Sequence, residues 1–110
     1  MKAYAIAHVQ SAQPGPQIVE YLTRIDATLA PFDGQFLVHG DPGDVREGDF
    51  VGNVIVIEFP TRRNARAWYE SAEYQQILPL RTRNTTGWLI LVDGVGSDHV
   101  ATDILVPESS

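Results

Sequence analysis

The 110-residue sequence predicts one α+β domain whose elements follow the order β-α-β-β-α-β. Two observations carry this prediction: four short runs rich in apolar, β-branched or aromatic residues lie between turn residues, and two stretches have apolar residues at helical spacing. Elements in this order form a four-stranded antiparallel sheet with both helices on one face. The expected strand order is 4-1-3-2, with right-handed crossovers.

The first half of the chain supplies two strands and one helix. Residues 3–9 are the expected first strand, and the Pro-Gly-Pro sequence at 14–16 breaks the chain after it. Apolar residues at helical spacing between positions 18 and 29 predict a helix, which Pro31 ends because proline cannot continue the hydrogen-bond ladder. Residues 35–39 are the expected second strand.

The second half repeats the same order of strand, helix and strand. Residues 53–59 form the most β-branched stretch and the expected third strand. Thr61 is the expected N-cap of a second helix, which Ser71 caps a second time. A turn at 84–87 should then lead into the fourth strand, residues 88–92.

Both faces of the predicted sheet are apolar, which indicates that the domain is half of a larger structure. Strict alternation places Phe36 and Val38 on one face and Leu37 on the other. The corresponding opposed sets in the third and fourth strands are Val54 and Val56 against Ile55, Ile57 and Phe59, and Trp88, Ile90 and Val92 against Leu89 and Leu91. An exposed apolar face is costly in water and prone to aggregation, so we expect a homodimer that packs sheet against sheet. The alternative is cover by the apolar patch at 104–106, which could also reach a partner.

Composition narrows the classes of partner and chemistry. The net charge of −6 argues against nucleic acid and anionic membranes, which need a basic surface. The absence of cysteine removes disulfides, thiol nucleophiles and cysteine-ligated metals. No apolar run is long enough for a signal peptide or a membrane span, so a cytoplasmic location is the expectation.

Several short motifs, taken in order, resemble one protein family. They are the run from Asp33 to Gly40, Glu47-Gly48-Asp49, Glu58-Phe59-Pro60, Trp68-Tyr69, Ser71 and Glu73-Tyr74. Together they resemble the domain-of-unknown-function family 1330, within the dimeric α/β-barrel (ferredoxin-like) superfamily. The resemblance implies a ferredoxin-like dimeric domain over residues 1–95 and a C-terminal tail at 96–110. The superfamily includes cofactor-free monooxygenases, haem-degrading enzymes, isomerases and ligand-binding proteins, so it implies no single activity.

The topology gathers polar residues at one end of the sheet. His8 and His39 end parallel strands, and Arg81 ends the second helix, so all three should lie at the same rim. A basic rim of this kind suits a small carboxylate or acid–base chemistry. Trp68 and Tyr74 on the second helix complete the expected ligand-binding set, in a pocket between the sheet and that helix. For each residue a structural role, in packing or as a solvated charge, is the alternative.

Three functions remain open from the sequence. The first is a homodimeric small-molecule-binding protein, and the second is a cofactor-free isomerase or monooxygenase-like enzyme acting on a small aromatic or carboxylic metabolite. The third is a dimerisation module without a ligand. No metal or cofactor is expected, and no catalytic residue is assigned. The acidic loop from Asp41 to Asp49 is expected to be solvated, with a lid over the pocket as its alternative.

Overall fold

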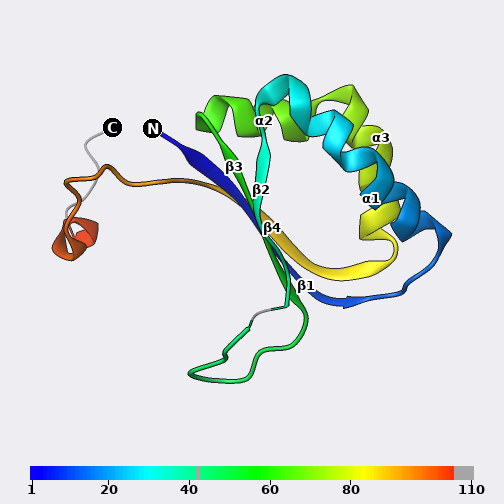
Figure 1. The fold of residues 1–110 in the computed structure, drawn as a ribbon, viewed down its shortest axis with the longest axis horizontal. Helices are drawn as coiled ribbons and strands as arrows, with labels where there is room; N and C mark the ends of the chain where they lie inside the picture. Colours follow the sequence, from blue (N-terminus) through cyan, green and yellow to red (C-terminus); the bar gives the residue numbers. More distant parts are fainter. Residues whose placement is uncertain (42, 106–110) are drawn as a thin grey trace.

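The computed structural model describes residues 1–41 and 43–105 and contains the predicted elements in the predicted order (Figure 1). The strands are β1 (Ala3–Ala12), β2 (Gln35–Gly40), β3 (Asn53–Phe59) and β4 (Thr85–Asp93). The helices are α1 (Pro16–Leu29), α2 (Arg62–Glu70) and α3 (Ala72–Thr82), with 3₁₀ turns at Ala30–Phe32 and Ala101–Leu105. The sheet has the order β2-β3-β1-β4 and its pairs are antiparallel, which confirms the predicted topology.

The predicted division of the second helix is confirmed. The Thr61 hydroxyl accepts a hydrogen bond from the backbone N–H of Asn64 at 3.1 Å and so caps α2. The Ser71 hydroxyl does the same for α3, accepting from the N–H of Tyr74 at 3.2 Å. Ser71 itself has an extended backbone, so it ends one helix and starts the next. One threonine hydroxyl and one serine hydroxyl thus cap the N-termini of α2 and α3.

The predicted turn at 84–87 is wrong, because β4 begins at Thr85. The first strand continues beyond its predicted end at residue 9, and its last residues pair with the start of β4: Ser11 with Thr86 and Ala12 with Thr85. The register of pairing shifts between Val9 and Ser11. The last residues of β1 therefore lie beyond an irregularity that the alternation of apolar and polar residues does not show.

A second irregularity lies in β2. Phe36 pairs with Ile57 of β3, but the next pair along is Val38 with Val56, so Leu37 is an extra residue in the strand. The prediction that Phe36 and Val38 share a face is therefore wrong, because the inserted residue reverses the alternation after it. Both faces still contain apolar residues.

The helices cover one face of the sheet, and the core lies between these two layers (Figure 1). Its largest fully buried side chains are Phe59, Trp68, Tyr74 and Ile77. The Trp68 indole N–H donates to the Thr28 hydroxyl at 3.0 Å, which ties α2 to α1. The largest buried side chains thus gather around Trp68, where α2 packs against the sheet.

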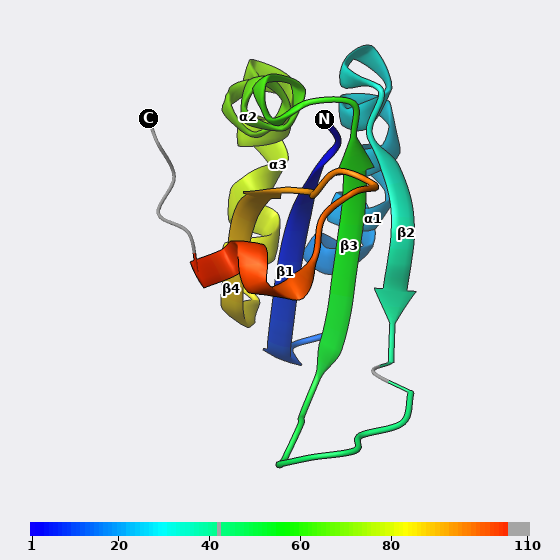
Figure 2. The same cartoon turned by 90° about the vertical axis from the view of Figure 1, so that its left-hand side faces the viewer.

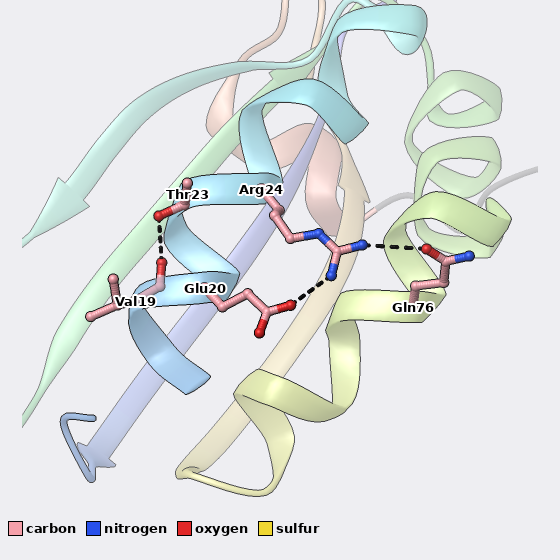
Figure 3. A network of polar contacts seen from close by, with 5 residues as sticks. All are labelled: Val19, Glu20, Thr23, Arg24 and Gln76. Atoms are coloured by element: carbon pink, nitrogen blue, oxygen red, sulfur yellow. Dashed lines mark hydrogen bonds and ion pairs between the residues drawn. The ribbon is translucent and has the colours of Figure 1, made fainter. Parts of the chain in front are cut away.

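Polar contacts join α1 to α3 at the molecular surface (Figure 3). Arg24 donates to Glu20 on its own helix at 2.7 Å and to the Gln76 side-chain oxygen of α3 at 3.3 Å. Exposed contacts of this kind contribute little to stability, so the buried core rather than this network holds α1 against α3.

The opposite face of the sheet, here called the open face, carries none of the three α-helices of the described residues (Figures 1 and 2). Trp88 and Ile90 on this face are about half exposed. The chain after β4 extends away from the sheet on this side (Figure 1), and Ile104 and Leu105 in it are 82% and 78% exposed. These two residues of the predicted apolar patch therefore leave the sheet of their own protomer uncovered, while Val106 lies outside the described residues.

Candidate ligand-binding site

A cavity of about 240 Å³ lies between α1 and the helix-covered face of the sheet. Its walls come mainly from apolar side chains of α1 and of all four strands. The sequence predicted a pocket against the second helix, and this placement is corrected: α2 and α3 contribute one lining residue each, Trp68 and Arg81, whereas α1 contributes four.

The cavity exists because the central strand carries small side chains toward the helices. Ala5 and Ala7 of β1 both line it, and both are buried. They pair with Ile57 and Ile55 of β3, whose larger side chains form the wall beside them. A leucine or isoleucine in place of Ala7 would extend into the space, since cores are normally packed without voids of this size.

One end of the cavity is closed and the other reaches the surface. The lining residues Tyr21, Ile25 and Trp68 are buried, whereas His39 and Asn53 are exposed. A ligand would therefore enter past His39 and Asn53 and place its apolar part against Trp68 and the α1 side chains.

His39 lines the cavity because of the irregularity in β2. The register shift pairs His39 with Ile55, a residue of the helix-covered face, whereas strict alternation from Phe36 would turn the imidazole to the open face. The His39 ring stacks on Phe36, with 4.6 Å between ring centroids and an interplanar angle of 14°. This stacking holds the imidazole at the edge of the cavity.

Arg81 is the cationic residue of the cavity wall, near the C-terminal end of α3. Its guanidinium carbon lies 6.0 Å from the centre of the Tyr21 ring. The Nε atom is buried and has no hydrogen-bond partner in the described part of the chain. Among residues 1–41 and 43–105, no carboxylate lies within ion-pair distance of Arg81. A partly buried cation thus borders an apolar space without a counter-charge.

Two tyrosines connect α1 to α3 beside this arginine. The Tyr21 and Tyr74 hydroxyls are 2.8 Å apart and hydrogen-bonded. Burial, followed by the proximity of Tyr74, raises the pKa of Tyr21 well above its ordinary value, so its phenol stays neutral at physiological pH. Burial lowers the pKa of Arg81, but the adjacent Tyr74 and Tyr21 outweigh that effect and leave it raised. Arg81 is therefore charged and Tyr21 is uncharged at physiological pH.

His8 does not line the cavity. It pairs with Val54 and Trp88 on the open face, so the expectation that it shares a rim with His39 is corrected: the two histidines lie at the same end of the sheet but on opposite faces. His8 Nε2 lies 2.7 Å from the Val51 carbonyl oxygen, and its ring centroid is 4.7 Å from that of Phe50. The loop that follows β2 thus leans on the open face, away from the cavity.

The structure brings His39, Trp68 and Arg81 together around the cavity, while Tyr74 lies one layer behind and contacts it through Tyr21. Sequence reasoning did not single out Tyr21 for the site, because its place in the apolar stripe of α1 suggested packing alone. Two features of the sequence could have indicated it. Tyr21 carries a hydroxyl within an otherwise apolar stripe, and the alternate alanines of β1 are small side chains that leave space between the sheet and the helices.

Within the described residues, no group of three or more His, Asp or Glu side chains is placed to bind a metal ion. In the same part of the chain, none of the helices has the length and hydropathy that crossing a membrane requires.

The topology and the layered helices define a ferredoxin-like α+β domain, here with a cavity between its layers. The chain belongs to the family described as Domain of unknown function (DUF1330), whose model matches residues 2–95. No curated protein matches it.

Three solved structures illustrate the likeness in fold. A dimeric ferredoxin-like protein of unknown function from Jannaschia sp. CCS1 has a TM-score of 0.67 and 9% identity, over 86% of this chain and 100% of that one. A second dimeric ferredoxin-like protein of unknown function, from Thermobifida fusca, has a TM-score of 0.57 and 16% identity, over 84% and 91%. A Chloroflexus aurantiacus protein described provisionally as an antibiotic biosynthesis monooxygenase has a TM-score of 0.51 and 15% identity, over 90% and 99%. At these identities the likeness concerns the fold alone.

Proposed function

We propose that this protein is a homodimeric small-molecule-binding domain and that the cavity between α1 and the sheet is its binding site. The observation that carries the proposal is the cavity itself, which is closed at one end, apolar along its walls and bordered by Arg81 and His39. Apolar walls with a few placed polar groups are typical of ligand sites. Residues 1–95 form the domain in this proposal, and 96–110 form a tail.

The size of the cavity limits the ligand. The cavity has a volume of about 240 Å³. This volume is below the range of about 300–1,000 Å³ typical of sites for drug-sized ligands. The proposed ligand is therefore a compact metabolite, with one ring or a short branched chain.

Ligand binding is expected to raise the melting temperature of the wild-type protein in a thermal-shift screen of small carboxylates and small aromatic compounds. A ligand at about 100 times its Kd stabilises the folded state by about 2.7 kcal/mol. Ala7→Leu should remove the shift, because the new side chain occupies the cavity. Ala72→Leu, on the exposed side of α3, is the matched control and should keep it.

The outcome against the proposal is equally clear. If no compound stabilises the wild type, or if Ala7→Leu retains the full shift, the cavity is not the binding site. A dimer that binds none of the compounds would then favour a dimerisation module without a ligand.

The enzymatic alternative depends on His39, the imidazole that lines the cavity. An imidazole can transfer protons near neutral pH, as a cofactor-free isomerase or oxygenase requires. The likeness in fold to the Chloroflexus aurantiacus protein is compatible with this alternative. Chemical analysis of each stabilising compound after incubation separates the two: recovery unchanged supports a binding protein, and conversion that His39→Ala abolishes supports an enzyme.

The homodimer of this proposal forms through the open face. Val38, Trp88 and Ile90 are large apolar residues of this face and each is 42–50% exposed. Burying them against a second copy removes apolar area from water, which is the main driving force of association. The proposed tail, whose Ile104 and Leu105 are exposed, would pack on the partner. Two similar structures of this fold are themselves dimeric.

Sedimentation equilibrium at micromolar concentration should give twice the chain mass of 12.2 kDa. Ile90→Asp should return the mass to about that of one chain, because it places a charge on the exposed apolar face. Val19→Asp is the control: Val19 is also exposed, but it lies on α1, so this variant should stay dimeric. A wild-type mass near that of one chain would rule out the homodimer.

A further inference from the structure

We infer that the ligand of the cavity is a monocarboxylate with a compact apolar body, and that its carboxylate pairs with the guanidinium of Arg81. This inference rests on the proposed binding function and adds to it the chemical class of the ligand. Its basis is the state of charge and hydrogen bonding around Arg81.

The charge of Arg81 is uncompensated within the described part of the chain. At the surface, Lys2 lies 3.2 Å from Glu58, and Arg24 lies 2.7 Å from Glu20. Arg81 is less exposed than either and has no such partner among residues 1–41 and 43–105. Taking a cation out of water without a counter-charge is unfavourable. An anion that enters the cavity therefore interacts more strongly with the poorly hydrated guanidinium of Arg81 than with a fully solvated one.

The hydrogen bonding of Arg81 points the same way. Among residues 1–41 and 43–105 its Nε–H has no acceptor, and because the Nε atom is fully buried it does not face the cavity. The two terminal nitrogens are the donors left to a ligand, and their planar arrangement matches the two oxygens of a carboxylate. One carboxylate would therefore neutralise the charge and accept hydrogen bonds from the guanidinium.

The tyrosine pair supplies a further donor. Two hydroxyls carry two hydrogens, and the bond between Tyr21 and Tyr74 uses one of them. When Tyr74 donates to Tyr21, the Tyr21 hydrogen is free to point toward the ligand, because Tyr21 lines the cavity. A donor chain from Tyr74 through Tyr21 suits an anionic acceptor, since each bond strengthens the next.

The rest of the cavity selects the body of the ligand. Ala5, Ile25, Ile57 and Trp68 offer apolar surface, and Arg81 is the guanidinium in the wall. A second anionic group on the ligand would be desolvated without a matching cation at the closed end. The arrangement therefore favours one carboxylate on an aromatic ring or on a short branched chain over a dicarboxylate or a phosphate.

The test compares acids with their neutral amides. Isothermal titration measures the binding of benzoate, phenylacetate and isovalerate, each beside benzamide, phenylacetamide and isovaleramide, to the full chain. We expect at least one acid to bind at least ten-fold more tightly than its amide. Arg81→Gln should weaken that acid at least ten-fold and change the amide by less than three-fold. Arg83→Gln, an exposed arginine two residues further on, is the matched control and should change neither.

A second measurement separates a ligand-binding role from a structural one. In the absence of ligand, Arg81→Gln and Arg81→Lys should both keep the circular-dichroism spectrum and cooperative melting of the wild type, while only Arg81→Lys, which retains the charge, should still prefer the acid over its amide. If folded Arg81→Gln keeps the full preference for the acid, or if Arg81→Lys loses it as completely as Arg81→Gln does, the inference is overturned.

The two proposals fail differently. If amides bind as tightly as acids and Ala7→Leu removes both, the carboxylate class is wrong while the binding function stands. If neither acids nor amides bind to the wild type, both the inference and the proposed site fall.

Discussion

Replacement of Trp68 by alanine is expected to lower the free energy of unfolding by about 3–5 kcal/mol, a large part of the stability of a domain this size. Trp68 is fully buried, and its ring lies 4.2 Å from that of Tyr74 and 5.5 Å from that of Phe59. Alanine leaves a void at the junction of α2, α3 and β3. It also leaves the Thr28 hydroxyl without the indole donor. Urea denaturation followed by circular dichroism measures the loss.

Trp88→Ala is the matched control for this experiment. Trp88 is the same residue type but 50% exposed on the open face. Its replacement should destabilise the protein less, and in a way that depends on protein concentration if the open face is the dimer interface. The difference in free energy of unfolding between Trp68→Ala and the wild type should be the same at every protein concentration. Equal losses in the two variants would contradict the assignment of Trp68 to the core.

Gly87→Ala is expected to lower the free energy of unfolding by about 3 kcal/mol. The φ angle of Gly87 is 147°, which L-residues rarely adopt. A Cβ atom there would also collide with the backbone carbonyl oxygen of His8 on the neighbouring strand. Strands β1 and β4 would have to separate where Gly87 pairs with Val9, next to the register shift in their ladder. Thermal and urea denaturation both report the change.

Gly48→Ala is the control for the backbone angle. Gly48 also has a positive φ, 73°, but a Cβ atom there meets nothing within 4 Å. Its replacement should lower the free energy of unfolding by only about 1–2 kcal/mol, which is the steric cost of the left-handed conformation alone. If both variants lose the same stability, the close approach of β1 to β4 at Gly87 contributes nothing.

The fold could be predicted almost entirely from the sequence, because each element is marked by its own local pattern. Strand β3 combines β-branched residues with a proline after its last residue, and Thr61 and Ser71 mark the starts of both helical segments. The errors lie where tertiary pairing extends a strand. Thr85 and Thr86 look like part of a turn, yet they have partners because β1 continues to Ala12.

The candidate site could be predicted only in part. The residue types at positions 39, 68 and 81 were enough to nominate them, because topology places strand ends and helix ends together. The face on which His39 lies could not be predicted, since it depends on a one-residue register shift that leaves no mark in the hydrophobic pattern. That Arg81 has no ion-pair partner among the described residues is likewise a property of the folded chain, not of its local sequence.

The extra residue in β2 has an evolutionary consequence. Leu37 determines which side of the sheet position 39 serves, whereas the residue at position 39 determines what chemistry arrives there. The face that position 39 occupies and the side chain at that position are thus encoded by two nearby codons and can change independently. Loss of one codon in this edge strand would transfer the imidazole from the cavity to the open face, so that one deletion could exchange a ligand contact for a contact with another protein.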